Sequence, residues 1–477
     1  MITPEAIAEA RRQLGRHLAA LRRAAGYNSQ HDLAPLTFYG RSTIANVETG
    51  RQHARRAFWQ RCDEVLGTGG VLAAGYDEIE AMMARQRDEA VQAFQANRSG
   101  VIGRGQRDDR PDGGPCWTSD LGQALREAAA LWGEELAAGA GEAIDVAAAG
   151  EIAFRWLVAP RDGSPARGDS RRRVGQSDVE RLRAVRRTLK AADNAHGGGA
   201  ALPMAIAYLR REVRPLLDGR YDDGTGTALF GVTAELTLDV GWMAYDNADH
   251  GLAADYMGHA LRLSHAADDR LFGGRVLAAM SHQALHLGHV RLSVDLANAA
   301  RVGTEHIVTP RARAMFAAME AMAQAADRDP RRFTVALGTA ESALAQAGSS
   351  EDDPDWLDFD EGGLWGHAAR AYRYLDNGEE CERHAQRAIA LCLDEHGRTR
   401  AQRQAILATG QLRRGDVEQA AATGMRVVAT AWGLTSRHVD QEIVVLTRAV
   451  QRTRSKSTTC TGFLDQAREY LAARNLP

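Results

Sequence analysis

Three polar side chains within residues 41–48 have the types and the spacing for hydrogen bonds to the base edges of DNA. Arg41, Ser42 and Asn46 fall on one side of a helix, at positions i, i+1 and i+5 of the stretch RSTIANVE. Ile44 and Val47 are three residues apart and fall on the opposite side. A helix that enters the major groove needs this division between polar side chains that face the bases and aliphatic ones that anchor it. The stretch therefore predicts a recognition helix.

A second set of candidate residues lies on predicted helices of the C-terminal half. Trp242, His282 and His286 either line a concave pocket for a small molecule or peptide, or pack between helices. The two histidines are four residues apart, a spacing that can hold zinc on a helix. No third ligand is evident nearby, so we expect no metal site. The acidic segment Glu351–Glu361 lacks the glycine and the ligand alternation of a calcium loop, and we expect a solvated loop that runs into a helix.

The sequence contains no familiar catalytic motif. We find no G-x-S-x-G, phosphate loop, H-E-x-x-H or dinucleotide fingerprint. The run Gly197-Gly198-Gly199 follows a helical pattern and is typical of a helix end, not of a phosphate site. The five cysteines are scattered without C-x-x-C spacing, which favours neither a disulfide framework nor a zinc site. We therefore expect no enzymatic activity and no cofactor.

Charge is unevenly divided along the chain. The 477 residues carry 59 Lys and Arg against 62 Asp and Glu, a net charge of −3. Residues 1–61 hold ten Arg and four acidic residues, so this end has six positive charges in excess and the remainder nine negative ones. A cationic end on an acidic body indicates a nucleic-acid-binding module joined to another domain. Because we find no apolar run near the roughly 20 residues of a membrane span and no signal peptide, we expect a cytoplasmic protein without membrane contact.

Composition and periodicity divide the chain into four parts. Residues 1–96 are predicted to form a helical DNA-binding domain with a following helix. Residues 97–116, rich in Gly, Arg and Asp, are predicted to be a flexible linker. Residues 117–225 form a helical connecting region, and residues 226–477 a repeat domain for sensing and dimerisation. Strand signals are scarce, so the predicted fold class is all-α.

A repeat of helical hairpins is the strongest pattern in the C-terminal half. The small Gly241 and the aromatic Tyr245 precede a turn at Ala248, and small residues follow on the next helix, an order that lets two antiparallel helices pack closely. Such hairpins need neighbours to bury their apolar faces, so we expect a superhelix with a concave inner surface. Equivalent turns recur at intervals of 40, 41, 49 and 37 residues, at Gly288, near Asp329, at Gly378 and at Gly415.

Leu21 to Gly50 resembles the phage-repressor-like (XRE-type) helix-turn-helix family, and the likeness covers residues 8–70. The hairpins resemble tetratricopeptide repeats. The whole chain is similar to large actinobacterial regulators that join such a DNA-binding domain to a tetratricopeptide-like sensor. The segments that carry this wider resemblance are FWQRCDEVLGTGGVLAAGYD, VGQSDVERLRAVRRTLKAADNAHGGGAA, GWMAYDNADHGLA and MSHQALHLG.

The resemblance implies a role for the polar residues of this region. Gln30, at the start of the second helix, would contact a phosphate or a base edge. Arg41, Ser42 and Asn46 would face the bases, where Arg can pair with guanine and Asn with adenine. Backbone-phosphate contacts would come from Thr43 and Arg51.

The resemblance also implies an internal salt bridge between Arg22 and Glu48. The chain departs from the family pattern in the turn, where Phe38 stands in place of the usual glycine and Gly40 follows two residues later. Pro35 lies inside the second helix, where it cannot donate a backbone hydrogen bond. The resemblance therefore does not determine the geometry of the turn.

These features predict an all-α transcription regulator, with an N-terminal helix-turn-helix bundle followed by a tetratricopeptide-like α-superhelix. We expect a homodimer that binds an operator of inverted half-sites in double-stranded DNA, and a small-molecule or peptide effector that acts on the superhelix. The alternative is a protein-interaction scaffold of tetratricopeptide type with a vestigial helix-turn-helix.

Overall fold

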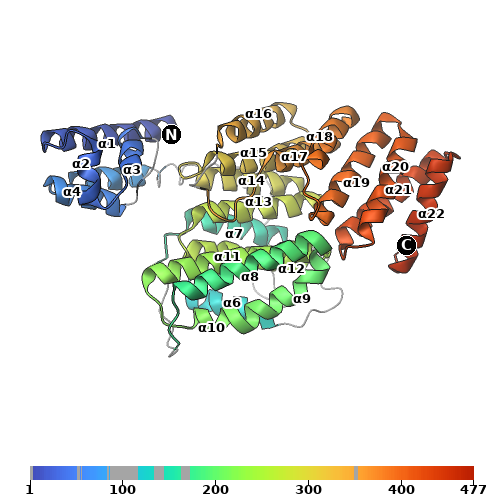
Figure 1. Cartoon of the computed structure of the whole chain (residues 1–477), viewed down its shortest axis with the longest axis horizontal. Coiled ribbons are helices and arrows are strands. Elements are labelled where there is room, and N and C mark those ends of the chain that lie inside the picture. Colours follow the sequence, from blue (N-terminus) through green and yellow to red (C-terminus); the bar gives the residue numbers. More distant parts are fainter. Residues whose placement is uncertain are drawn as a thin grey trace, which may run out of the picture. The chain divides into compact units, whose positions relative to one another are not determined.

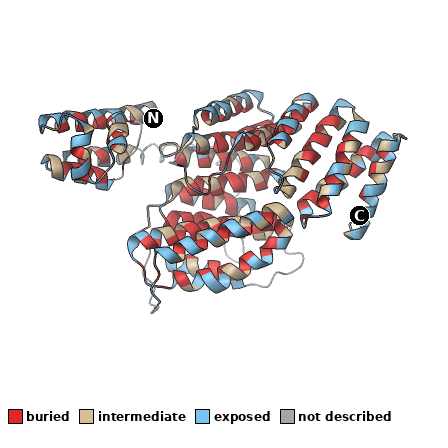
Figure 2. Ribbon diagram, viewed as in Figure 1, coloured by how far each residue is buried: buried red, intermediate tan, exposed pale blue. Residues whose placement is uncertain are grey.

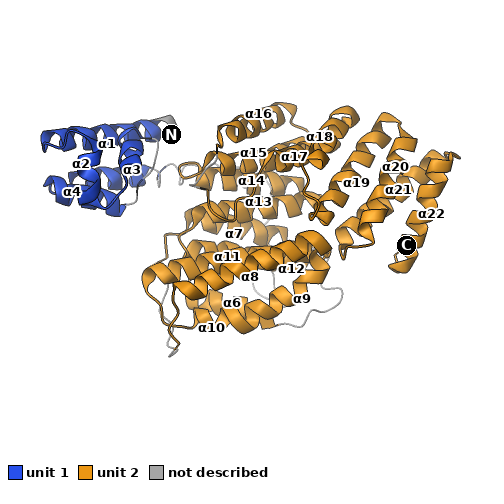
Figure 3. Ribbon diagram, viewed as in Figure 1, with its two compact units in different colours: residues 1–107 blue, residues 108–477 orange. Residues whose placement is uncertain are grey.

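A computed structural model describes residues 4–50, 54, 56–82, 85, 117–133, 144–162, 172–348 and 353–476. These residues are helical apart from turns and loops, and their only strand-like feature is an isolated bridge between Arg173 and Arg220. The chain separates into two compact units, residues 1–107 and 108–477 (Figure 3). No described helix has both the length and the apolar character needed to cross a membrane. The predicted all-α fold class is confirmed for the described residues.

The first unit is a small bundle of short helices (Figure 1). It contains α1 (Pro4–Ala24), α2 (Gln30–Thr37), α3 (Arg41–Glu48), α4 (Arg56–Leu66) and a helix over residues 71–82. The turn between the last two is held by Asp63, whose carboxylate accepts hydrogen bonds from the backbone N–H of Leu72 at 3.0 Å and of Ala73 at 2.8 Å. The core of the unit is formed by Ile7, Leu14, Leu18, Leu33, Ile44, Val47, Phe58, Trp59, Cys62, Leu72, Tyr76 and Ile79.

The second unit is a long succession of antiparallel helices. Its first part contains α6 (Leu121–Gly133), α7 (Val146–Val158), α8 (Gln176–His196), α9 (Gly198–Tyr208), the π-helical turn η1 (Leu209–Val213) and α10 (Arg214–Leu217). The hairpins follow as α11 (Asp223–Asp246), α12 (His250–Ala266), α13 (Arg270–His286), α14 (Val290–Thr304), α15 (Pro310–Ala326), α16 (Pro330–Gln346), α17 (Glu361–Tyr374), α18 (Gly378–Ala390), α19 (Gly397–Arg414), α20 (Val417–Ala431), α21 (Arg437–Thr453) and α22 (Thr458–Ala473).

Each of the five predicted hairpin turns joins two packed helices, from the pair α11 and α12 to the pair α19 and α20. Every turn contains one residue in the left-handed conformation, with φ between +60° and +88°. These residues are Ala248, Gly288, Arg328, Asp376 and Gly415. Successive hairpins also contact one another, so they form the predicted superhelical array. Buried residues gather where the helices of this array face each other (Figure 2).

Small residues permit close helix packing in the array. A Cβ on Gly241 of α11 would lie 3.1 Å from the Cγ of Met257 and 3.4 Å from the carbonyl oxygen of Ala253, both on α12. Trp156 of α7 packs in the same way against α13, where a Cβ on Gly273 would lie 2.7 Å from its Cε2. The predicted close approach of α11 and α12 is therefore confirmed.

The two ends of the array meet at the glycine run 197–199. Gly197, with φ +88°, ends α8 and precedes α9, as the sequence predicted for a helix end. The N–H of Gly199 donates to the carbonyl oxygen of Thr435 at 3.0 Å. The N–H of Thr435 in turn donates to the carbonyl oxygen of His196 at 2.6 Å. Helix α8 also contacts α19, and α11 contacts α21. The first and last parts of the superhelix thus wall a common interior.

Candidate nucleic-acid interface and ligand pocket

The turn between α2 and α3 accommodates the residue that departs from the family pattern. Phe38 caps the end of α2 with φ +63°, a left-handed conformation that explains why glycine is usual at this position. Its side chain is 83% exposed, and the guanidinium carbon of Arg61 lies 5.0 Å from its ring centroid. Helix α2 is continuous from Gln30 to Thr37 although it contains Pro35. Helix α2 therefore begins at Gln30 as predicted, and α3 has the predicted bounds.

Helix α3 divides into the two predicted faces. Ile44 and Val47 are 0% and 1% exposed and pack in the core of the unit. Arg41 and Ser42 are exposed, and Asn46 is half-buried. Among the described residues, none offers these three side chains a hydrogen bond or an ion pair. Their polar groups are therefore available to another molecule.

Helix α3 is fixed to α1 by an ion pair at its last residue. The Nε of Arg22 lies 2.7 Å from Oε1 of Glu48, and its Nη2 lies 3.1 Å from Oε2. Both side chains are buried, at 5% exposure. This confirms the predicted salt bridge. Gln30 also donates its side-chain N–H to Glu48 Oε2, at 2.9 Å, so a contact between Gln30 and DNA remains a prediction.

A glycine that the sequence analysis did not single out brings α1 against α3. A Cβ on Gly15 would lie 2.7 Å from the carbonyl oxygen of Glu48 and nearer still to that of Val47. Thr43 lies half-buried on α3, beside the polar face. Arg51 falls outside the described residues, so its predicted phosphate contact has no structural account. Four of the six predicted DNA-contacting residues, Arg41, Ser42, Thr43 and Asn46, share α3.

A helix-turn-helix family model matches residues 13–74. The match covers α2, the turn and α3 completely, together with the part of α1 that carries Arg22. Neither the curated proteins nor the solved structures contain a significant match to the chain. The match supports a DNA-binding regulator with a helix-turn-helix domain.

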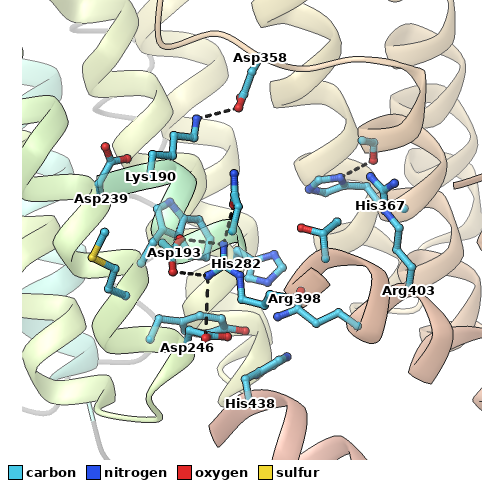
Figure 4. Close-up of a pocket in the computed structure, with 18 of the residues that line it drawn as sticks. Lys190, Asp193, Asp239, Asp246, His282, Asp358, His367, Arg398, Arg403 and His438 are labelled. Carbon is cyan, nitrogen blue, oxygen red and sulfur yellow. Dashed lines mark hydrogen bonds and ion pairs between the residues drawn. The ribbon is translucent and has the colours of Figure 1, made fainter. Parts of the chain in front are cut away.

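The second unit contains a pocket of about 270 Å³ between the two ends of the superhelix (Figure 4). Its walls come from α8, α11, α13, α15, α17, α19, α21 and the loop before α17. Two of the predicted ligand-binding residues, Trp242 of α11 and His282 of α13, line it. The third, His286, is one turn further along α13 and packs beside the pocket, with its ring centroid 4.8 Å from that of His438.

Four histidines surround Tyr245 at the base of the pocket. Its ring centroid lies between 5.3 and 5.7 Å from those of His250, His282, His286 and His438. Burial lowers the pKa of His286 to about 4 and that of His438 to about 3, because a charged imidazole loses its hydration there. His286 and His438 are therefore neutral at pH 7. Within the described ranges, no group of three or more His, Cys, Asp or Glu side chains is arranged to hold a metal ion.

Ion pairs connect the walls of the pocket. Arg398 of α19 lies 2.8 Å from a carboxylate oxygen of Asp193 on α8 and 4.0 Å from Asp246 on α11. Lys190 lies 2.7 Å from Asp358 of the loop before α17. Figure 4 shows both sets of contacts reaching across the interior from different helices. The pocket therefore depends on charged contacts between residues far apart in sequence.

The acidic segment before α17 is not the solvated loop that the sequence predicted. Over its described residues, 353–360, the side chains of Trp356, Leu357 and Phe359 are buried. Arg311 of α15 holds the segment through Asp353, at 2.8 Å, and through the carbonyl oxygen of Phe359, at 2.9 Å. The prediction failed because the apolar residues between the acids pack on the superhelix. The predicted helix start is confirmed, since Asp360 caps α17.

Proposed function

We propose that this protein is a sequence-specific, DNA-binding transcription regulator that binds double-stranded DNA through α3. The observation that carries the proposal is the polar face of α3, where Arg41, Ser42 and Asn46 have no described partner while Ile44 and Val47 anchor the opposite face. Side chains of these types, held on a rigid helix, can form hydrogen bonds to base edges in the major groove. The family match over residues 13–74 supports the same function.

The proposal includes the finer features that the sequence resemblance implies. The protein would be a phage-repressor-like regulator of actinobacterial type, cytoplasmic and without catalytic activity. It would bind an inverted-repeat operator as a homodimer, because paired recognition helices match half-sites about one helical turn apart. The superhelix would act as a tetratricopeptide-like sensor and hold the dimer. An effector that prefers one curvature of the superhelix would shift the population of DNA-binding dimers.

Replacement of Arg41 and Asn46 tests DNA recognition. The operator is first identified by mapping the DNA that the full chain occupies. Arg41→Ala and Asn46→Ala should each weaken operator discrimination by about 1–3 kcal/mol, as expected for loss of a bidentate base contact. Arg468→Ala is the matched control, because Arg468 is an exposed arginine on α22 of the other unit. Unchanged discrimination in both α3 variants would favour the scaffold with a vestigial helix-turn-helix.

A further inference from the structure

The charges that line the pocket do not pair completely. Five cationic and four acidic side chains line it. Arg398 and Lys190 hold three of the carboxylates, on Asp193, Asp246 and Asp358. The fourth carboxylate, on Asp239, is held at 2.6 Å by Arg186, which lies outside the lining. All four carboxylates are therefore occupied, and three guanidinium groups remain. These belong to Arg275, Arg370 and Arg403.

None of the three remaining arginines forms an ion pair with a carboxylate of the described residues, although Asp358 and Asp239 act on the charge of Arg275, Glu442 on that of Arg370 and Asp360 on that of Arg403 from a longer distance. Arg275 of α13 forms no hydrogen bond or ion pair with any of them. Arg370 of α17 donates to the neutral amide oxygen of Gln402, at 3.3 Å. Arg403 of α19 donates to the carbonyl oxygen of Ala388, at 2.5 Å. The three cations thus converge on one cavity from three helices.

The three arginines are half-buried, and partial burial makes this arrangement unfavourable without a ligand. The pKa values of Arg275, Arg370 and Arg403 are all lowered, first of all because burial removes the hydration of the charged guanidinium. By contrast, the pKa of Arg398 is raised, since Asp193 and Asp246 stabilise its charge. An unpaired buried charge destabilises a fold unless something compensates it. An anion in the pocket would supply the missing negative charge.

Polar atoms in the same wall also lack partners. The side chains of the lining include four buried polar atoms that have no hydrogen-bond partner among the described residues. They are Trp242 Nε1, Tyr245 Oη, His282 Nδ1 and His438 Nδ1. The indole can only donate, and a hydroxyl or a neutral imidazole can donate as well. A ligand rich in oxygen acceptors would satisfy them.

Glycines leave room for such a ligand beside the arginines. Gly363 and Gly366 of α17 both line the pocket. A Cβ on Gly366 would lie 3.6 Å from Nε of Arg403, so the glycine keeps that guanidinium uncovered. The volume of about 270 Å³ lies just below the range for small-molecule sites, roughly 300–1,000 Å³. This size excludes an extended peptide.

From these observations we infer that the pocket binds a small oxyanion, a molecule carrying carboxylate or phosphate groups, through Arg275, Arg370 and Arg403. The inference rests on the proposed function in one respect, since it takes this molecule to be the effector. The sequence left a small molecule and a peptide as possible effectors, and the pocket favours an anionic small molecule. The aromatic and histidine side chains at the base would donate hydrogen bonds to its oxygens.

Thermal unfolding of the full chain tests the inference with citrate, pyrophosphate and inorganic phosphate as probes. Comparison of citrate with pyrophosphate shows whether the pocket prefers carboxylate or phosphate groups. Binding to the folded state raises Tm, and above Kd the rise grows with the logarithm of ligand concentration. At least one probe should therefore give such a rise beyond that of KCl at equal ionic strength. The neutral trimethyl ester of citrate should give none. The inference is overturned if no probe stabilises the chain, or if the neutral ester does so equally.

Two variants and a matched control locate the site. Arg275→Gln and Arg370→Gln should each weaken probe affinity at least tenfold. Arg275→Gln should also raise the Tm of the ligand-free chain, because it removes a half-buried charge that forms no ion pair. A variant that merely damaged the fold would lower that Tm. Arg291→Gln is the control, since Arg291 lies on α14 with its side chain 87% exposed. Probe affinity unchanged in both pocket variants would overturn the inference.

A parallel measurement of operator affinity separates this inference from the proposed function. If the probe binds as predicted but operator affinity does not respond to it, the anion site stands and its role as effector site is wrong. If the chain binds no operator at all, the proposed function fails, and the Tm measurements decide on the anion site independently.

Discussion

Glu48, the last residue of α3, accepts two hydrogen bonds from Arg22 of α1, at 2.7 and 3.1 Å. Because both side chains are buried, removal of one leaves an uncompensated charge in the core. We expect Glu48→Ala to destabilise the first unit by about 3–5 kcal/mol. Hydrogen exchange of α1 and α3 in the full chain would measure this, because α3 would lose its protection from exchange together with α1.

An exposed ion pair in the same unit is the control for this prediction. The Nε of Arg56 lies 2.8 Å from Oδ1 of Asp77, and the two side chains are about half exposed, at 50% and 49%. Asp77→Ala should therefore change the stability far less than Glu48→Ala, because solvent screens an exposed ion pair. Similar losses in Glu48→Ala and Asp77→Ala would show that burial of the Arg22–Glu48 pair is not what matters.

Gly15 should tolerate no side chain. Its Cβ would collide with backbone oxygens of α3, which cannot move aside as a flexible side chain can. We expect Gly15→Ala to separate α1 from α3, to destabilise the unit by roughly 1–3 kcal/mol and to weaken operator binding. Gly338→Ala adds the same methyl group within α16, where nothing lies within 4 Å. There alanine should stabilise the helix by about 0.5–1 kcal/mol. A neutral Gly15→Ala would contradict the packing of α1 on α3.

The hairpin turns predict opposite effects for opposite substitutions. Gly288 has φ +81°, and a Cβ at this position would meet no atom within 4 Å, so only backbone conformation disfavours alanine there. Gly288→Ala should cost about 1 kcal/mol, since a left-handed conformation crowds Cβ. Ala248 has φ +60° in the equivalent turn. Ala248→Gly should therefore stabilise the folded chain by a few tenths of a kcal/mol or more. Denaturant unfolding of both variants would measure the two signs, and equal signs would contradict the shared turn geometry.

Acid should destabilise the superhelical unit between pH 6.5 and 4. A histidine whose pKa is lowered by folding binds its proton more readily when unfolded, so its stabilising contribution is complete above 6.5 and is lost as the pH falls towards the folded pKa. Burial lowers the pKa to about 4 for His259, His286, His367 and His384, and to about 3 for His438. Five acids act in the opposite sense, because burial raises the pKa of Asp193 to about 6 and that of Glu235 to about 7, and also raises the pKa values of Asp249, Glu320 and Asp440.

Burial also lowers the pKa values of His265 and His282. Seven histidines therefore oppose five acids, and the net effect of acid is destabilising. We expect calorimetry of the full chain to show Tm lower by roughly 5–10 °C at pH 5 than at pH 7. His438→Phe should reduce this difference, because it removes one neutral imidazole that acid would charge. His17→Gln is the control, since His17 is exposed on α1 of the other unit. A Tm that rises on acidification would contradict the assignment of the histidines as neutral.

Local signals made the helix-turn-helix predictable. Ser29 precedes α2, and Gly40 precedes α3, so the start of each helix could be read from residues that favour helix N-termini. The hairpin turns were predictable for a similar reason, because small residues and turn residues recur at nearly regular spacing. The left-handed conformation of Phe38 was indicated only by the glycine that the family has at this position, since an aromatic residue by itself gives no sign of it.

The charged lining of the pocket could not be predicted from the sequence. Arginine is usually exposed, and nothing near Arg275, Arg370 or Arg403 in the sequence marks them as buried. They converge only because stacking of the hairpins brings α13, α17 and α19 around one interior. The buried segment 353–360 was missed for the same reason, since its partners Phe272 and Arg311 come from other hairpins.

The contacts that join the two ends of the superhelix have a consequence for the order of folding. Lys190 and Asp358 are 168 residues apart, Ser436 and Asp246 are 190 apart, and Arg398 and Asp193 are 205 apart, whereas each hairpin closes across a turn of a few residues. Because distant contacts require closure of longer loops, we expect hairpins to form early and these contacts last. A nascent chain would then acquire its ligand cavity only after α21 has been synthesised.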